Sequence, residues 1–348
     1  MVLTACGQTH TICLDPFGCL WVFGSNELGQ IGCPESWIEK IPKQLQDLPR
    51  MKSVACGRYH TLCCDENGDV WSFGYNCHGQ LGTGNTETAR SPTKLPRFSE
   101  ITDVRCGYAH SVCIDTYNSC WSFGFNQHHQ LGHSEEENQV SSAKRILSPS
   151  QVKDVHCGGN FTVCIEKYGR VSCFGANQYG QLGLQSPIIE KPTIVPSLHN
   201  IVDAACGETH NIFLQNSGAV LYCGQGSLVG ENQKITEPLI MPLPPIVKIS
   251  TFAGGSIAVD REGNVWKFAA LQSVEPSELP VQDVSGFSRG LFGHIFLYTS
   301  GTVWSMGSNS DGQLGFPDFM DRKQLTQLPE ELALIWRESR TRAKSALK

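Results

Sequence analysis

The sequence repeats itself with a period of about 50 residues, and this repeat limits the possible folds more than any other feature. The first four units share a Cys-Gly pair, a turn near the middle of the unit, and a closing loop that reads GQLG or a close variant. Three later units keep parts of this pattern. The mid-unit turns lie at Gly18, Gly68, Asn118, Gly169, Gly218, Gly263 and Gly301. Seven such units fill the chain, so we expect one duplicated architecture rather than two unrelated domains.

Each unit has the pattern of four short β-strands. In the second unit, residues 61–64 and 70–73 are β-rich runs on either side of Glu66-Asn67-Gly68, which is typical of a hairpin turn. A further strand precedes each Cys-Gly pair, as at 101–105, and another follows a proline, as at 92–95. Four-stranded units repeated radially form a β-propeller. A solenoid is disfavoured because it needs polar capping repeats, and the first unit is as regular as the second. The sequence therefore predicts an all-β fold, a seven-bladed β-propeller of four-stranded blades.

We expect the C-terminal strand to close the ring. The first unit has no proline-led strand in front of it, whereas the segment near 323–328 follows the seventh unit. We therefore predict that this segment completes blade one, which removes two exposed sheet edges. Pro329, the glutamates that follow it and the basic residues near the end indicate a short C-terminal helix. The predicted organisation is a propeller over 1–328 and a C-terminal helix or tail over 329–348.

The composition excludes several classes of protein. Glycine accounts for 35 of the 348 residues, charged residues are only 17%, and the formal net charge is −6. A disordered chain would carry more charge, and a general nucleic-acid binder a positive balance, so we expect no direct nucleic-acid contact. No apolar run approaches the roughly 18 residues of a membrane span, and no signal peptide is visible.

The chain has sixteen cysteines, and nine of them recur at two equivalent places in the repeat. No CxxC pair occurs, so the spacing of a zinc ribbon is absent. We interpret these residues as small, buried, reduced thiols that fill equivalent core positions. Reduced thiols are typical of the cytoplasm, with the nucleus as the alternative compartment.

The pattern CG-x-x-H, then a turn glycine, then W-x-FG-x-N-x-x-GQLG resembles the regulator-of-chromosome-condensation family. The unit ACGRYHTLCCDENGDVWSFGYNCHGQLG, which starts at Ala55, shows the pattern, and the resemblance covers nearly the whole chain. It implies a seven-bladed propeller whose tryptophans pack between blades. It also implies that the two residues between Cys-Gly and His lie on one face of the ring. Leu221 replaces a tryptophan and Gly255 a histidine, so we expect blades five and six to be less regular.

The recurring polar residues favour packing over catalysis. His10, His60, His110 and His210 share one repeat position, but Phe161 and Gly255 interrupt the series, so we interpret these histidines as structural rather than as metal ligands. Cysteine lies near histidine in several units, whereas catalysis needs one site. The sequence contains no dinucleotide-binding or Walker loop. We therefore predict no catalytic residue, no metal site, no cofactor and no covalent chemistry.

The two residues between Cys-Gly and His differ from unit to unit, as expected where a repeat faces a partner. This position supplies the five predicted partner-binding residues: Arg58, Tyr59, Tyr108, Asn160 and Glu208. Tyrosine and arginine are enriched at binding hot spots, although an ordinary polar surface is the alternative for each residue. The similar plant ultraviolet-B receptor dimerises through this face with Trp and Arg. This chain has no Trp there, so a photoreceptor is excluded.

Two functions remain open for a propeller that we expect to be monomeric. The first is an intracellular scaffold or regulator that holds a protein partner on one face. The second is guanine-nucleotide exchange on a small Ran- or Rab-like GTPase, the founding activity of the family that the sequence resembles, with Glu208 as a candidate group. The founding exchange factor carries a β-wedge insertion, and the first five units show no long insertion, which disfavours exchange. Chromatin binding would need a basic tail, and a ubiquitin ligase a further domain for which no residues remain.

Overall fold

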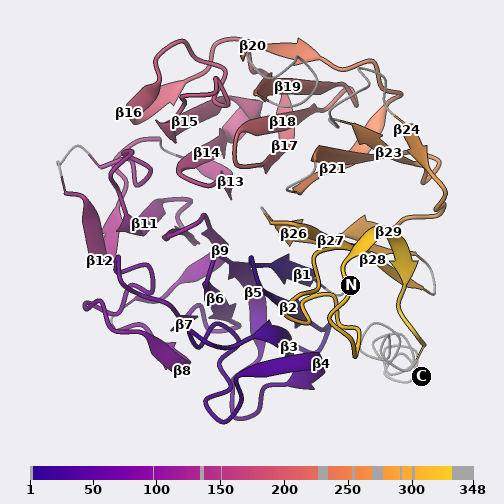
Figure 1. Ribbon diagram of the computed structural model, residues 1–348. Helices are drawn as coiled ribbons and strands as arrows, with labels where there is room; N and C mark the ends of the chain where they lie inside the picture. Colours follow the sequence, from indigo (N-terminus) through magenta and orange to yellow (C-terminus); the bar gives the residue numbers. More distant parts are fainter. Residues whose placement is uncertain are drawn as a thin grey trace, which may run out of the picture.

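The structure, a computed structural model, describes residues 3–96, 98–133, 137–149, 151–225, 234–252, 255–268, 277–290, 292–299 and 302–330. Seven small antiparallel sheets radiate from a central axis and form a closed ring (Figure 1). This confirms the predicted seven-bladed propeller of four-stranded blades. The strands follow one another in chain order from the axis outward, because each pairs with its neighbour in the sequence.

The strand bounds show how closely the blades repeat. Blades one to four contain β1 (Leu3–Cys6), β2 (His10–Leu14), β3 (Leu20–Ser25) and β4 (Ile38–Gln44); β5 (Met51–Cys56), β6 (His60–Asp65), β7 (Val70–Gly74) and β8 (Ala89–Lys94); β9 (Ile101–Cys106), β10 (His110–Asp115), β11 (Cys120–Phe125) and β12 (Gln139–Arg145); and β13 (Val152–Cys157), β14 (Phe161–Glu166), β15 (Val171–Ala176) and β16 (Ile188–Ile194). A single turn of 3-10 helix, η1 (Lys167–Gly169), follows β14.

Blade five repeats the strand lengths of blade two, whereas blades six and seven contain some shorter strands. Blades five to seven contain β17 (Ile201–Cys206), β18 (His210–Gln215), β19 (Val220–Gly224) and β20 (Ile235–Ile240); β21 (Ile246–Phe252), β22 (Gly255–Asp260), β23 (Val265–Phe268) and β24 (Ser277–Leu279); and β25 (Gly286–Phe287), β27 (His294–Tyr298), β28 (Val303–Gly307) and β29 (Arg322–Gln327). The two-residue strand β26 (Arg289–Gly290) joins the sheet of blade one.

Burial follows the order of the strands within a blade. The second strands β6, β10 and β14 are buried along their whole length, because a neighbouring blade covers each face of the sheet. This explains why they read as continuous apolar runs with small polar residues rather than as an alternating pattern. The fourth strands are partly exposed and contain the prolines Pro42, Pro92, Pro192 and Pro238. Proline lacks an N–H group and suits an edge strand.

An aspartate at the end of the second strand holds each regular hairpin together with its tryptophan. In blade two, Asp65 Oδ1 accepts backbone hydrogen bonds from Asn67 at 2.9 Å and Asp69 at 3.0 Å, and Trp71 Nε1 donates to Asp65 Oδ2 at 3.2 Å. The Trp71 side chain packs against the core that blades one and two share. The same pairs recur as Asp15 with Trp21, Asp115 with Trp121 and Asp260 with Trp266. The other tryptophans likewise pack against cores that two neighbouring blades share, which confirms that they lie between blades: Trp21, Trp121, Trp266 and Trp304.

Histidines link neighbouring blades through hydroxyl groups. The Nε2 atoms of His10, His60, His110, His210 and His294 lie 2.9–3.1 Å from the hydroxyl oxygens of Thr61, Ser111, Thr162, Ser256 and Thr11 respectively. Opposite Phe161, which replaces the histidine of blade four, Asn211 takes the place of the hydroxyl residue. Each histidine is buried, and this burial lowers its pKa. Each of these histidines thus makes a structural hydrogen bond between blades.

The prediction that the segment near 323–328 completes blade one is wrong. β29 pairs with β28 and forms the outer strand of blade seven. In each unit the proline-led strand follows the closing loop and pairs with the third strand of the same unit. β4 is therefore already the outer strand of blade one. The ring closes instead by backbone pairing of β26 with β1. The predicted helix over 329–348 has no support, because residues 331–348 lie outside the described residues.

Side chains of blade one complete this closure. Thr11 Oγ1 donates to the carbonyl oxygen of Gln313 at 2.8 Å and lies 2.9 Å from His294 Nε2. We expect Thr11→Val to lower the free energy of unfolding by about 1–3 kcal/mol, because it leaves two buried polar groups without a partner. Urea unfolding followed by tryptophan fluorescence measures the change. Thr326→Val, at an exposed hydroxyl of β29, is the control and should change stability by less than about 0.5 kcal/mol.

Candidate functional site

The loops between the first and second strands of the blades form one face of the ring. Their backbones are linked in series: Gln8 N donates to Arg58 O at 3.2 Å, Arg58 N to Tyr108 O at 3.1 Å, and Tyr108 N to Gly159 O at 3.0 Å. Blades one to four therefore present their variable residues side by side. The hairpin turns between the second and third strands lie at the other end of these strands, on the opposite face.

Tyr108 is the centre of this face. Its half-buried ring stacks on Phe292 of blade seven, with the ring centroids 5.4 Å apart and the planes 21° from parallel. The hydroxyl group of Tyr108 lies close enough to the carboxylate of Glu208 in blade five to interact with its charge. Burial and then the charge of Glu208 raise the pKa of Tyr108, so the phenol stays protonated. A Cβ atom at Gly159 would come within 3.1 Å of the Tyr108 ring, so glycine makes room for this arrangement.

Arg58 extends the cluster toward blades one and two. Its guanidinium carbon lies 5.4 Å from the ring centroid of Tyr59 and 5.6 Å from that of Tyr108, which is within cation–π range. Its Nε atom donates to the side chain of Gln8. Arg58 and Glu208 are exposed, whereas the tyrosines are partly buried. A cation, aromatic rings and a carboxylate thus form one continuous surface.

The structure brings four of the five predicted residues together: Arg58, Tyr59, Tyr108 and Glu208. Asn160 follows Gly159 in the same series of loops, but its Oδ1 atom accepts a hydrogen bond from Gln130 Nε2 at 3.3 Å, in the closing loop of blade three. Phe292 was not predicted. Its contact with Tyr108 joins units three and seven, and nothing in the sequence of the degenerate seventh unit indicates it.

A central cavity of about 440 Å³ is a second polar feature of the ring, and the repeat pattern alone does not indicate it. The first strands of the blades line it with residues one and three places before the cysteine of the Cys-Gly pair. The nearer position is Ala5, Ala55, Arg105, His156 and Ala205, and the farther one is Leu3, Ser53, Asp103, Asp154 and Asp203. In some units these two positions hold charged or polar residues instead of Ala and Leu. This difference between units is the sequence signal that could have indicated the polar side of the cavity.

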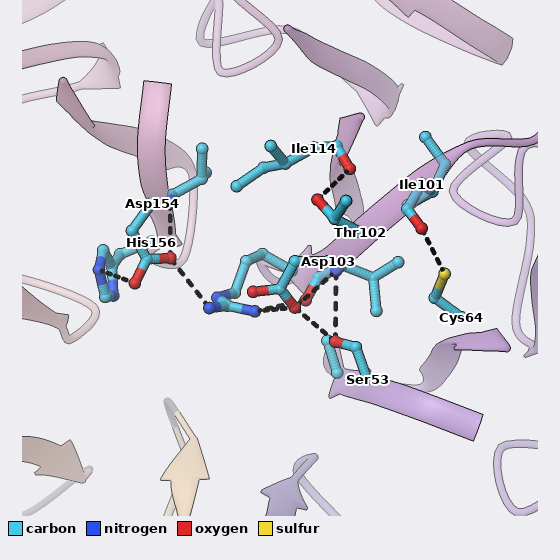
Figure 2. A network of polar contacts seen from close by, with 12 residues as sticks. Ser53, Cys64, Ile101, Thr102, Asp103, Ile114, Asp154 and His156 are labelled. Atoms are coloured by element: carbon cyan, nitrogen blue, oxygen red, sulfur yellow. Dashed lines mark hydrogen bonds and ion pairs between the residues drawn. The ribbon is translucent and has the colours of Figure 1, made fainter. Parts of the chain in front are cut away.

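An ion-pair network lies on blades three and four in this cavity (Figure 2). Arg105 is 2.5 Å from Asp103 Oδ1 through Nη1 and 2.9 Å from Asp154 Oδ1 through Nη2. Ser53 donates a hydrogen bond to Asp103. Burial opposes the charge on Arg105, but the carboxylates of Asp103 and Asp154 raise its pKa above the ordinary value. Arg105 is therefore a fixed cation.

The buried cysteines do not have the properties of nucleophiles. In blade two, Cys56 Sγ lies 3.4 Å from Ala5 O, and burial raises its pKa well above the ordinary value. Burial lowers the pKa of nearby His60 to about 3, so this residue is a poor base. Reactive thiols need the thiolate form. None of the sixteen cysteines forms a disulfide bond, and all but Cys19 and Cys77 are buried.

Comparison with known proteins gives the family. Over 215 residues the chain is 29% identical to the probable E3 ubiquitin-protein ligase HERC4 of Homo sapiens, covering 54% of this chain and 20% of that protein. It is 28% identical over 224 residues to the Ras guanine nucleotide exchange factor C of Dictyostelium discoideum, covering 56% and 15%. The chain therefore spans a fifth or less of the length of these relatives.

A solved structure agrees over the whole propeller. The crystal structure of Prp20p from Saccharomyces cerevisiae superposes with a TM-score of 0.78 at 18% identity, covering 94% of this chain and 87% of that one. Within the part of the chain that the structure describes, no helix is long and apolar enough to cross a membrane. The model of the RCC1-like domain matches residues 1–268. The chain belongs to the family of RCC1-like domains.

Proposed function

We propose that this propeller is an intracellular regulator or scaffold that binds a protein partner on the face of Arg58, Tyr59, Tyr108, Asn160 and Glu208. The observation that carries the proposal is the surface in which Arg58, Tyr108 and Glu208 join blades two, three and five. Aromatic rings fixed by neighbouring contacts lose little conformational entropy on binding. The exposed Arg58 and Glu208 offer charges of both signs, so the partner surface would carry complementary charges around an apolar centre.

The cysteines support an intracellular setting. All sixteen are without disulfide bonds and most lie in the core between blades. Such thiols persist where the environment is reducing, as in the cytoplasm or the nucleus. We propose one of these compartments, and a monomeric propeller, as the working state of the protein.

Guanine-nucleotide exchange on a small GTPase is the second candidate. The similarity to an exchange factor for Ras favours it. The similarity in fold to Prp20p also favours it, since the structure of Prp20p is described together with its binding properties to Gsp1p and histones. An exchange factor binds the nucleotide-free GTPase more tightly than the loaded form. The match covers only 15% of the Ras exchange factor, so its activity is a proposal for this chain. The ligase activity in the name of HERC4 is not proposed, because the match covers a fifth of that protein.

Removing the exposed part of the face should abolish partner binding without unfolding the ring. We expect proximity labelling in cells to detect proteins near the wild-type chain that an Arg58→Ala, Tyr59→Ala double variant no longer labels. The thermal midpoint of this variant should be nearly unchanged. Tyr108→Ala is a poor choice because it also breaks the contact with Phe292. The matched control is Tyr117→Ala with Tyr168→Ala, since these tyrosines are 72% and 86% exposed in hairpin turns of the opposite face. If the wild type, the face variant and the control variant label the same set of proteins, the face is wrongly assigned.

The release of fluorescent GDP from a panel of small GTPases separates the two functions. Accelerated release from one GTPase, lost in the Arg58→Ala, Tyr59→Ala variant and kept in the control, supports exchange. Neighbours that disappear with the variant while no GTPase releases nucleotide support a scaffold. Release that the face variant leaves unchanged would contradict exchange through this face.

A further inference from the structure

We propose that Asp154, His156 and Asp203 bind one divalent transition-metal ion, of which Zn²⁺ fits best, in the central cavity. One ligand atom from each side chain lies within 4.8 Å of the other two. Asp154 and His156 are two residues apart on β13, so both point toward the channel, and Asp203 takes the equivalent place to Asp154 on β17. Imidazole nitrogen and carboxylate oxygen are common ligands of zinc.

The distances suit a shared ion. His156 Nε2 lies 3.5 Å from Asp154 Oδ2 and 3.6 Å from Asp203 Oδ1. Ligands bound tetrahedrally at zinc distances are separated by about 3.3–3.4 Å. Both contacts are longer than a good hydrogen bond, which is about 2.7–3.2 Å for nitrogen and oxygen. The three atoms lie within 4.8 Å of one another, so a shift of the two carboxylates toward each other would place all three around one ion.

Neighbouring side chains hold the ligands in place. Arg105 Nη2 binds Asp154 Oδ1 at 2.9 Å, which turns the other oxygen, Oδ2, toward His156 (Figure 2). Asp103 in turn fixes Arg105, and Ser53 fixes Asp103. Such partners of ligating groups orient a metal site.

The charge of the cavity also favours a cation. Three aspartates line it, against Arg105 and the exposed Lys52, so the charged Asp, Lys and Arg side chains of the lining are net negative. Arg105 pairs with Asp103 and Asp154, whereas no Lys or Arg among the described residues forms an ion pair with Asp203. A divalent ion would compensate the carboxylate of Asp203 and remove the repulsion between the two aspartates beside His156.

Three protein ligands leave one tetrahedral position open. The small side chains of Ala5, Ala55 and Ala205 border the cavity at the same level as His156, so the space beside the ion is not filled by protein. Catalytic zinc sites have three protein ligands and a water molecule in the fourth position, whereas structural sites are closed. The site is thus of the open type, able to accept water or one further donor.

The test uses the full chain, stripped with EDTA and titrated with ZnCl2 by calorimetry. We expect one ion per chain and a thermal midpoint that rises as zinc is added in excess, because the ion binds the folded state. Asp203→Asn removes a ligand charge at constant shape and should weaken binding by more than about 100-fold, beyond the usual effect of a change outside the ligands. Asp283→Asn, at an exposed aspartate that does not line the cavity, is the matched control and should leave the affinity for zinc unchanged.

Cobalt identifies the ligands independently. Co²⁺ bound by nitrogen and oxygen gives visible bands without thiolate charge transfer, and these bands should vanish in His156→Ala. Circular dichroism of that variant verifies that the ring is folded, and Asp203→Asn gives a second reading if it is not. Thiolate charge transfer that survives in His156→Ala would place the ion on cysteines and overturn the proposal. Equal zinc affinity in wild type and Asp203→Asn, or no binding at all, would overturn it as well.

Discussion

Acidification from about pH 7 to about pH 5 is expected to lower the free energy of unfolding by several kcal/mol. Five buried histidines bridge the blades, and burial lowers the pKa of His10, His60, His110 and His294 from 6.5 to about 3 and that of His210 to about 4. In the unfolded chain these groups take up protons near pH 6.5. In the ring they stay neutral, because each imidazole is sealed between two sheets.

The sign follows from the linkage between protonation and folding. Above pH 6.5 both states carry neutral imidazoles, so these groups leave stability unchanged. Between pH 6.5 and about 3–4 the unfolded chain binds more protons, so stability falls as the pH falls. Each pH unit in that window costs up to about 1.4 kcal/mol per histidine. The summed loss from five histidines is large compared with the free energy of unfolding of a typical native protein, which is roughly 5–15 kcal/mol.

Urea unfolding at a series of pH values measures this dependence. The slope of stability against pH should correspond to several protons taken up on unfolding, and His110→Asn should reduce it by about one proton. His199→Ala is the control, because His199 is exposed and bridges no blades. A stability that is constant between pH 7 and pH 5 would contradict the neutral, bridging role of these histidines.

Gly107→Ala is expected to destabilise the ring by about 3 kcal/mol or more, since overpacking of a well-filled site costs about 1–3 kcal/mol and a backbone clash adds to it. A Cβ atom at this position would lie 2.1 Å from Cε1 and 2.4 Å from Nδ1 of His110. It would also lie 2.5 Å from the carbonyl oxygen of Gly158 in the next blade. The imidazole of each CG-x-x-H segment thus occupies the space over its own glycine. The thermal midpoint and urea unfolding should both report the loss.

Two further variants separate the causes of this loss. Gly107→Ala with His110→Ala removes the clash with the imidazole but not the one with Gly158, so we expect it to remain strongly destabilised. Gly293→Ala is the control, because no atom lies within 4 Å of a Cβ atom there, and its effect should be within about 0.5 kcal/mol of zero. A Gly107→Ala protein as stable as wild type would contradict the tight approach of the blades.

Much of the fold could be predicted because the same pattern of strands and turns recurs in several units. Residues 61–64 and 70–73 were predicted as strands around a turn and form β6 and β7. The place of the C-terminal strand could not be predicted. Each unit has a proline-led strand at its boundary, and the sequence does not say whether this strand pairs with the unit before it or after it. That choice depends on hydrogen bonds such as those between β28 and β29.

The sequence also indicated most of the proposed partner face, because residues that pack recur and residues between Cys-Gly and His vary. It did not indicate that Tyr108 contacts Phe292, which comes from another blade. It also did not indicate the cavity cluster. Asp154 and Asp203 are 49 positions apart in the chain, and they become neighbours only when adjacent first strands meet at the axis.

The sequence by itself determined the number of blades, the strands within them and the glycine, histidine and tryptophan positions that pack. These features follow from local propensities and from a period that is repeated along the chain. The tertiary structure alone decided how the ring closes, which variable side chains meet across it, and which polar groups share the central cavity. The physical reason is that closure brings together residues from distant units, and their distances depend on the packing of the whole ring rather than on any one segment.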